Sequence, residues 1–284
     1  MSFDLHTHST VSDGTEPPAM VVAEAARAGL RGLALTDHDA TAGWAEARAA
    51  AEAHGLGFIP GMEVTSMAAG ISVHVLSYLH DPEHPGMRQL NAAARAGRVE
   101  RAKQICARLA EDLPITWEAV LEQVGPDAAI GRPHLADALV AAGMVADRSE
   151  AFRKYLHRRS RYYVSQQNPH PVEVIRLIRQ AGGVPVIAHA MAVGRGQTLS
   201  PAQLEELVAA GLLGVEVHHR DNPEPGRALL LDLAARHDLI VTGSSDYHGA
   251  AGKPNRLGEN TTEADQVARI LQLGTGSQPY NVNP

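Results

Sequence analysis

The sequence lacks the features that would tie it to an oxidising compartment or a membrane. Cys106 is the only cysteine, which excludes an internal disulfide and suits a reducing compartment, so we expect a cytoplasmic protein. The first residues show neither the basic nor the apolar stretch of a secretory leader. No apolar run approaches the roughly 20 residues that span a bilayer, so we expect no membrane contact. Aromatic residues make up only 4% of the chain, but a hydrophobic content of 44% suffices for a globular core.

Charge is unevenly distributed. The net charge is −7, yet residues 87–161 hold 13 Lys/Arg against 9 Asp/Glu, a balance of +4, which leaves −11 for the rest of the chain. An acidic body suits bound cations and a basic middle segment suits an anionic substrate, although exposed arginines on solvated helices would give the same balance. The overall acidity argues against binding to long duplex nucleic acid, which requires a broad basic face.

Strand and helix patterns alternate at both ends of the chain. We predict strands at 3–8, 31–35, 58–63, 71–79, 184–188, 214–218 and 239–243, with helices at 17–28, 41–54, 172–181, 201–210 and 226–237. About seven such units indicate an α/β fold, a parallel barrel rather than an open sheet. Between them, 85–113, 117–124, 133–142 and 150–157 are predicted to be helical, and the next strand pattern is at 161–164. We therefore expect a barrel of residues 1–85 and 166–284, with a helical insertion, 86–165, covering the active site.

Side chains that bind metals follow the predicted strands. His6 and His8 are two residues apart at a strand end, so both rings point to one side of the sheet. A lone His-x-His pair is weak evidence, but Asp13, the pair at 37–38 and the Asp246-x-His248 pair occupy similar positions. Scatter of this kind does not suit a structural zinc module. Imidazole and carboxylate without thiolate favours manganese, zinc or iron, and the pattern is typical of a multinuclear metal-dependent phosphoesterase.

Taken together, these motifs resemble the PHP (polymerase and histidinol phosphatase) family over essentially the whole chain. The resemblance rests on residues 3–9, 12–15, 35–39, 60–63, 131–136 and 245–248. It implies a distorted (β/α)7 barrel with two to three divalent metal ions, most suitably Mn²⁺, with Zn²⁺ or Fe²⁺ as alternatives. The implied ligands are His6, His8, Glu63 and Asp246 for the first ion; Glu63, His74 and His134 for the second; and Asp13, His38 and His248 for the third. Asp37 is expected beside these ligands, orienting an imidazole or closing a turn.

The form of two motifs implies a substrate. Histidinol phosphatases often carry histidine where this chain has Asp13. That residue, together with the motif at 131–134 in a helical insertion, resembles small bacterial enzymes that release the 3′-phosphate of nucleoside 3′,5′-bisphosphates and degrade short 5′-phosphorylated oligonucleotides. The expected reaction is attack on phosphorus by a hydroxide that bridges the metals. Ala190 departs from the family, in which proline commonly follows the histidine.

Residues outside the ligand set are assigned less directly. His189 follows a strand and is our candidate for protonating the leaving oxygen or binding phosphate, with a hydrogen-bonding role as the alternative. The second phosphate would be held by Arg132, which can form two parallel hydrogen bonds, or by Arg195 or His219. The other basic residues of the middle segment are interpreted as a solvated face, which we favour over nucleotide guidance: Arg95, Arg98, Arg101, Arg158, Arg159 and Arg161. Tyr162 and Tyr163 are interpreted as core packing before base stacking.

Three alternatives stay open. One is a phosphatase for a small amine-bearing monophosphate such as histidinol phosphate, against which Asp13 and the basic segment argue. Another is a non-catalytic, metal-binding regulatory module, although such a module should have lost several ligands. The third is an amidohydrolase, because metal-containing barrels also hydrolyse amides.

Overall fold

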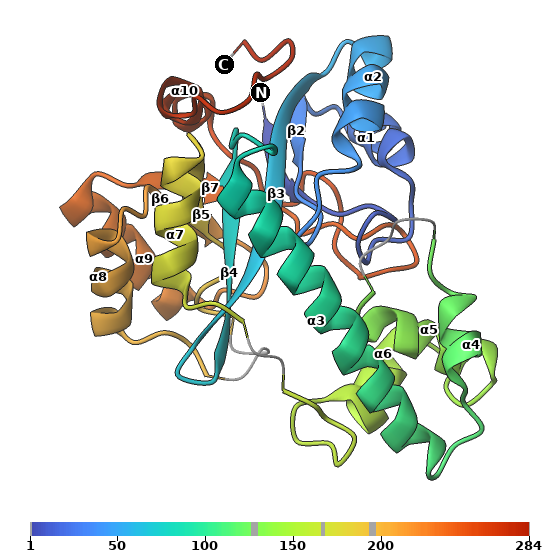
Figure 1. The fold of residues 1–284 in the computed structure, drawn as a ribbon. Coiled ribbons are helices and arrows are strands. Elements are labelled where there is room, and N and C mark those ends of the chain that lie inside the picture. The colour runs from blue at the N-terminus through green and yellow to red at the C-terminus, as the bar shows by residue number, and fades with distance from the viewer. Residues whose placement is uncertain (1, 126–129, 166–167, 193–196, 284) are drawn as a thin grey trace.

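Seven strands form a nearly closed barrel in the computed structural model, which describes residues 2–125, 130–165, 168–192 and 197–283 (Figure 1). Neighbours in the sheet follow the chain order from β1 to β7, and a bridge between Thr7 and Tyr247 brings the first strand to the segment after the last. The strands are β1 Phe3–Thr7, β2 Gly32–Leu35, β3 Gly57–Ala68, β4 Ile71–Tyr78, β5 Val184–Ile187, β6 Gly214–His218 and β7 Ile240–Gly243. The predicted distorted α/β barrel is therefore confirmed.

The direction of β4 corrects one expectation. Strands β1 to β3 are parallel, as are β5 to β7, but β4 is antiparallel to both of its neighbours, so the prediction of a wholly parallel barrel is wrong. Only Ala69 and Gly70 connect β3 to β4, with φ angles of 46° and 77°. Two residues in the left-handed region form a tight hairpin, whereas a parallel neighbour needs a crossover connection of a dozen or more residues.

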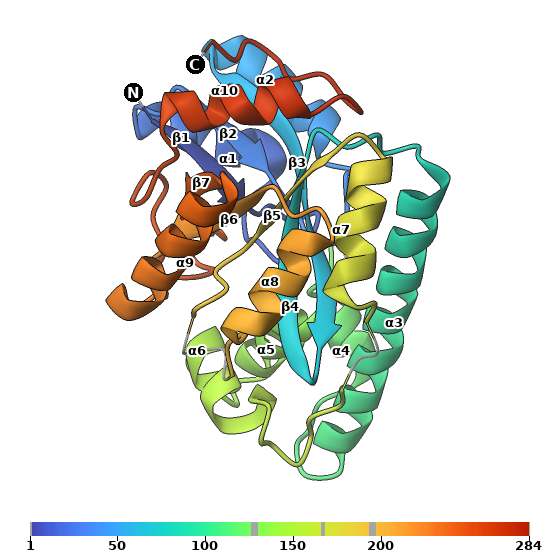
Figure 2. The same cartoon turned by 90° about the vertical axis from the view of Figure 1, so that its left-hand side faces the viewer.

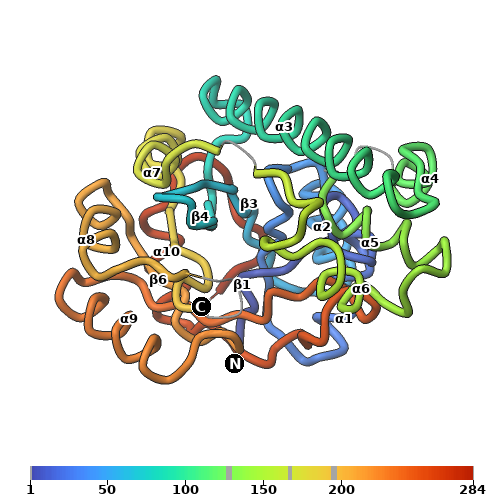
Figure 3. Tube along the Cα trace, turned by 90° about the horizontal axis from the view of Figure 1, so that it is seen from below, coloured from blue at the N-terminus to red at the C-terminus, as the bar shows by residue number. Residues whose placement is uncertain are grey.

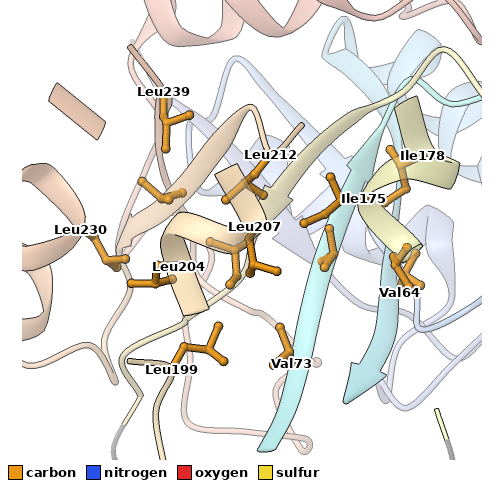
Figure 4. Packing of buried hydrophobic residues seen from close by; sticks show 14 of the residues in the cluster. Val64, Val73, Ile175, Ile178, Leu199, Leu204, Leu207, Leu212, Leu230 and Leu239 are labelled. Atoms are coloured by element: carbon orange, nitrogen blue, oxygen red, sulfur yellow. The ribbon is translucent and has the colours of Figure 1, made fainter. Parts of the chain in front are cut away.

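Helices cover the outside of the strands. They are α1 Pro18–Arg27, α2 Trp44–His54, α7 Pro171–Gln180, α8 Pro201–Ala209, α9 Glu224–His237 and α10 Ala264–Leu273 (Figure 2). Valine and isoleucine at one-turn spacing on α7 face the sheet, and the largest apolar cluster fills the space between them. Figure 4 shows part of that cluster: Val64, Val73, Ile175, Ile178, Leu204, Leu207 and Leu230. Helix α10 was not predicted; it packs on the barrel through Val267 and Ile270, which lie one turn apart.

The middle of the chain is helical and buries an apolar cluster of its own. Helix α3, Pro85–Ala110, runs along the barrel and extends past it to the helices α4 Trp117–Leu121, α5 Arg132–Ala141 and α6 Arg148–Ala151, followed by the π-helix η1 Phe152–Leu156 (Figure 1). Seen from below, α3, α7, α8 and α9 lie around the outer side of the strands (Figure 3). The strand predicted at 161–164 is wrong: these residues form a turn and irregular chain, and Tyr162 packs against the helical cluster. The domain boundaries at 86 and 165 stay a prediction.

Two contacts fix this helical part to the barrel. Arg98 of α3 donates through Nε and Nη2 to Oδ2 of Asp39, at 2.9 and 2.7 Å. Arg148 of α6 donates to the backbone oxygen of Asp13 at 3.0 Å and forms an ion pair with Asp137. Across the described residues, we find no helix whose length and apolar character would let it span a membrane.

Candidate metal centre

Three groups of ligand atoms lie on the barrel strands or on the loops that follow them. His6 belongs to β1, Glu63 to β3 and His74 to β4. The other members lie on the loops after β1, β2 and β7. Within each group, all candidate ligand atoms lie within 4.8 Å of one another. The groups are His6, His8, Glu63 and Asp246; His8, Asp13, His38 and His248; and His38, Glu63 and His74.

Glu63 connects two of the groups. Its Oε2 lies 3.2 Å from Nε2 of His6, 3.2 Å from Nε2 of His8 and 3.3 Å from Nδ1 of His38. Its Oε1 lies 2.6 Å from Nδ1 of His74 and 3.0 Å from Nε2 of His189. A carboxylate with donors around each oxygen has the geometry needed to bridge two cations about 3.5–4 Å apart.

The group at the pocket surface is organised around Asp13. Its Oδ1 lies 3.2 Å from Nε2 of His248 and 3.8 Å from Nδ1 of His8, and its Oδ2 lies 3.9 Å from Nε2 of His38. Because the rings of His8 and His38 also reach Glu63, neighbouring groups share members. The fold therefore brings together eight of the nine predicted ligands.

His134 is the ninth predicted ligand, and it lies outside all three groups. Its Nδ1 accepts a hydrogen bond of 3.0 Å from the backbone N–H of Gly131, which occupies the N-cap of α5. In the group with Glu63 and His74 the structure has His38 instead. A role for His134 as a ligand stays a prediction.

The donor set fits a divalent cation. Nδ1 of His38 and Nε2 of His248 are buried close to carboxylate oxygens of Glu63 and Asp13 but form no well-directed hydrogen bond in the described structure, and a bound ion would satisfy both nitrogens. Burial opposes charge on Glu63, yet the neighbouring imidazoles of His38 and His74 hold the pKa of its carboxyl well below the usual value. Buried carboxylates and imidazoles without thiolate suit Mn²⁺, Zn²⁺ or Fe²⁺.

The carboxylates around the inner group favour the protonated form of its imidazoles. Burial disfavours the charged form of His6, but Glu63, Glu216 and Asp246 raise its pKa well above the usual value. Burial also opposes charge on His8, and its hydrogen bonds to Asp246 and Glu63 raise its pKa to about 9. A metal ion would replace these protons, because a ligating imidazole must be neutral.

Glu216 is a site residue that sequence reasoning missed. It lies fully buried on β6, and its Oε1 is 3.0 Å from Nδ1 of His6 and accepts a hydrogen bond from the Ser244 hydroxyl. Its Oε2 accepts the backbone N–H of His189 at 2.7 Å. Burial alone would raise its pKa, but His6 lowers it to about 2. Glu216 thus fixes the orientation of His6, leaving Nε2 toward Glu63 and Asp246, as carboxylates commonly do for metal-binding histidines. A lone glutamate inside the apolar run of β6 was the available signal.

Two aspartates hold the strand ends in place. Asp37 accepts hydrogen bonds from the N–H and hydroxyl of Ser9 and from the hydroxyl of Ser12, so it closes the loop after β1, one of its two predicted roles. Asp39 accepts bonds from the N–H and hydroxyl of Thr65 and pairs with Arg98. Its φ is 51°, and His189 and Asp246 also have positive φ, 31° and 55°. Strained backbone of this kind commonly clusters at functional sites.

A pocket of ≈ 920 Å³ opens beside the groups. Asp13, His38, His74 and His248 line it, and so do seven cationic side chains: Arg98, Arg101, Arg132, Arg148, Arg158, Arg159 and Lys253. The volume lies in the usual range for ligand sites, roughly 300–1,000 Å³. The interpretation as a solvated face is therefore wrong for Arg98 and Arg101, which are partly buried in contacts with Asp39 and Val164, whereas Arg159 is exposed as expected. Tyr163 also lines the pocket, which corrects its interpretation as core packing.

The remaining predicted substrate residues lie elsewhere. His189 is buried against Glu63, and His219 is fully buried with Nε2 3.7 Å from Oδ2 of Asp246, so neither lines the pocket. Arg195 lies outside the described residues.

A nearly closed barrel with bridged imidazole–carboxylate groups beside an arginine-lined pocket defines a metal-dependent phosphoesterase. Comparison with known proteins agrees: a model of the PHP domain matches residues 4–128. The chain is 35% identical over 271 residues to the 3′,5′-nucleoside bisphosphate phosphatase of Chromobacterium violaceum, covering 95% of each protein. The chain belongs to the PHP domain family.

Two further relatives cover most of this chain. This chain is 34% identical over 257 residues to the 5′-3′ exoribonuclease Rnm of Salmonella typhimurium. The matched region covers 87% of this chain and 85% of that protein. A crystal structure from Bifidobacterium adolescentis, assigned to the metal-dependent phosphoesterases, is 48% identical with a TM-score of 0.94 and 96% coverage of each chain.

Proposed function

We propose that this protein is a metal-dependent phosphomonoesterase that removes the 3′-phosphate of nucleoside 3′,5′-bisphosphates, with a side activity on short 5′-phosphorylated oligonucleotides. The observation that carries the proposal is a single pocket lined both by metal-ligand side chains and by several guanidinium groups. Two kinds of anion-binding group in one pocket suit a substrate with two phosphates. The names of the relatives from Chromobacterium violaceum and Salmonella typhimurium support both activities. We place the protein in the cytoplasm on the basis of its single cysteine.

The three groups would hold two to three divalent ions, with Mn²⁺ the most suitable. When bound, such ions polarise the phosphoryl group and lower the pKa of water, which supplies a nucleophile at neutral pH. The chain contributes the position of the ligands: Glu216 orients His6, Asp37 closes the loop that carries His8 and Asp13, and Glu63 joins neighbouring groups.

Arg132 is the proposed anchor of the second phosphate. Its guanidinium lies 5.4 Å from the centre of the Phe152 ring and 5.9 Å from that of Tyr163, and its Nη1 donates to the carbonyl of Leu156 at 2.9 Å. Burial, with the neighbouring charge of Arg101, lowers its pKa to about 10. Within the described residues no carboxylate pairs with it. A partly buried cation of this kind is stabilised when an anion binds.

Its neighbours leave the positive charge uncompensated. Arg101 donates to the carbonyl of Val164 at 2.8 Å and Arg158 to that of Gly70 at 2.6 Å, so these guanidinium groups are positioned by neutral acceptors. Arg98 and Arg148 differ, because Asp39 and Asp137 neutralise them. Among the described residues, no carboxylate pairs with Arg101, Arg132, Arg158 or Arg159, and we assign the second phosphate to these side chains.

His189 and His219 are assigned to the metal side. Nε2 of His189 lies 3.0 Å from Oε1 of Glu63, where a proton for the leaving oxygen can be held close to the scissile phosphate. His219 contacts Asp246 and would orient that carboxylate rather than bind substrate.

The test is phosphate release from adenosine 3′,5′-bisphosphate in Mn²⁺, beside 5′-AMP, 3′-AMP and histidinol phosphate. Fast release from the bisphosphate with 5′-AMP as product, and slow release from the three monophosphates, is the expected result. Equal rates on all four, or a preference for histidinol phosphate, would refute the two-phosphate substrate. Absence of release from all four by the Mn²⁺-loaded protein would favour an amidohydrolase or a regulatory module.

A further inference from the structure

Lys253 is a cationic residue of the centre that the ligand motifs do not include. It lies on the loop after β7, seven residues beyond Asp246, and its Nζ is 2.8 Å from Oδ2 of that carboxylate. The side chain lines the pocket together with Asp13 and His248, and about a third of it is exposed, 35%. It therefore contacts a predicted metal ligand and faces the space open to substrate.

The loop around Lys253 is held in place by close contacts. A Cβ atom on Gly252 would lie 2.2 Å from the carbonyl oxygen of His248, and the N–H of Gly252 donates to the carbonyl of Gly249 at 3.0 Å. On the other side of the lysine, Nδ2 of Asn255 donates to the carbonyl of Ser245 at 2.6 Å. Both flanks are thus anchored to the segment that carries the ligands, so the position of Lys253 is set by the fold.

The two oxygens of Asp246 face different neighbours. Oδ1 lies 3.4 Å from Nε2 of His6 and 3.3 Å from Nε2 of His8, within the inner ligand group. Oδ2 faces Lys253 and, at 3.7 Å, Nε2 of His219. Because Oδ2 of Asp246 is held by Lys253, only Oδ1 is available to a metal ion. The carboxylate of Asp246 therefore separates the ammonium group from the inner ligand group.

An ammonium group has three hydrogen-bond donors, and Asp246 is the one partner of Lys253 among the described residues. A phosphomonoester carries up to two negative charges to a centre built on the carboxylates of Asp13, Glu63 and Asp246. A fixed positive charge at the pocket surface of that centre offsets this repulsion, and it counts most when the phosphoryl oxygens are most charged, in the transition state.

We propose that Lys253 is a further catalytic residue of the phosphoesterase: its ammonium group stays paired with Asp246 and contacts an oxygen of the phosphoryl group during transfer. This inference rests on the proposed function for the identity of the reaction. It differs from a purely structural pairing, in which Lys253 would only neutralise Asp246.

The test compares K253M and K253R with the wild type, all loaded with Mn²⁺. The matched control is K154M, because Lys154 also pairs with a carboxylate, Glu150 at 2.6 Å, but does not line the pocket. Three quantities are measured: kcat/KM for adenosine 3′,5′-bisphosphate, the Mn²⁺ content per chain, and the Kd of inorganic phosphate from its thermal stabilisation of the loaded protein. For K253M we expect kcat/KM to fall about 100-fold and phosphate to bind about tenfold more weakly, with Mn²⁺ content unchanged. K253R should recover part of both losses, and K154M should match the wild type.

Two results would overturn the role of Lys253. Unchanged kcat/KM and phosphate Kd in K253M would show that the ammonium does not contact the phosphoryl group. Loss of Mn²⁺ from both K253M and K253R in proportion to their activity would reduce Lys253 to a structural partner of Asp246. If the wild type hydrolyses no phosphate ester, the proposed function fails by itself, and the phosphate Kd still decides whether Lys253 binds a phosphoryl group.

Discussion

Replacement of Arg132 by methionine separates the two phosphate positions. The pKa of Arg132 falls to about 10 through burial and the charge of Arg101. A tenfold change in an equilibrium constant corresponds to about 1.4 kcal/mol, so the charged guanidinium costs the free protein up to about 3 kcal/mol at neutral pH, where it is protonated both folded and unfolded. Against this stand its hydrogen bond to Leu156, about 1 kcal/mol, and its contacts with Phe152 and Tyr163, about 0.5–1 kcal/mol each.

These terms nearly cancel, so R132M should unfold in urea with a free energy within about 1 kcal/mol of the wild type. Substrate recognition should change much more. A hydrogen bond to a charged group contributes about 1.5–3 kcal/mol, which predicts a loss of roughly 10- to 150-fold in kcat/KM for adenosine 3′,5′-bisphosphate. For 3′-AMP, which lacks the second phosphate, kcat/KM should stay nearly unchanged.

Steady-state kinetics on the two substrates decide the matter, with R153M as the control, because Arg153 lies in the same helical stretch but outside the pocket. An equal loss on both substrates would show that Arg132 does not hold the second phosphate. A similar loss in R153M would assign the effect to the general charge of the segment.

Two other changes test the surroundings of the site, and a third tests His80, a buried histidine just after β4. E216Q should weaken Mn²⁺ binding about 10- to 100-fold by loosening the orientation of His6; chelator competition measures this, and an unchanged Kd would contradict it. R98M leaves Asp39 buried without its cation and should cost about 3–5 kcal/mol in urea unfolding, a change below 1 kcal/mol being the contrary result. Burial lowers the pKa of His80 to about 4. Between pH 6.5 and 4 the unfolded chain therefore binds more protons than the folded protein, and the free energy of unfolding decreases as the pH is lowered. When the pH is lowered from 7 to 5, the free energy of unfolding of the metal-free wild type should decrease by about 2 kcal/mol more than that of H80N. Equal decreases would show that the pKa of His80 is not lowered by burial.

The elements that were predicted correctly have strong local patterns. The apolar runs of β2 and β5 are short and begin at or after a glycine; Thr36 follows the first directly, and one intervening residue separates His189 from the second. Several ligands lie at or after the ends of such runs, and because parallel strands present their carboxyl ends at one edge, His6 and Asp246 were expected to lie close together. Glu63 and His74, which lie inside their strands, were implied by the family resemblance instead.

Residues that were missed act through contacts distant in sequence. Glu216 reaches His6 across 210 residues, and a polar side chain inside β6 does not by itself indicate whether it faces solvent or the barrel interior. The arginines of α3 were interpreted as solvated because charge pattern does not tell which face of a helix turns toward the barrel; Arg98 turns toward Asp39. The antiparallel direction of β4, in contrast, could have been predicted from the sequence, because the two-residue connection at Ala69 and Gly70 is too short for a parallel crossover.

Titration of the metal-free protein with Mn²⁺ tests the central claim most directly, with bound metal per chain and phosphate release from adenosine 3′,5′-bisphosphate followed in the same samples. The groups joined by Glu63 predict saturation at two to three ions per chain, and phosphate release that appears only as these sites fill. Saturation at one ion or fewer, or full phosphate release before metal is added, would contradict the account.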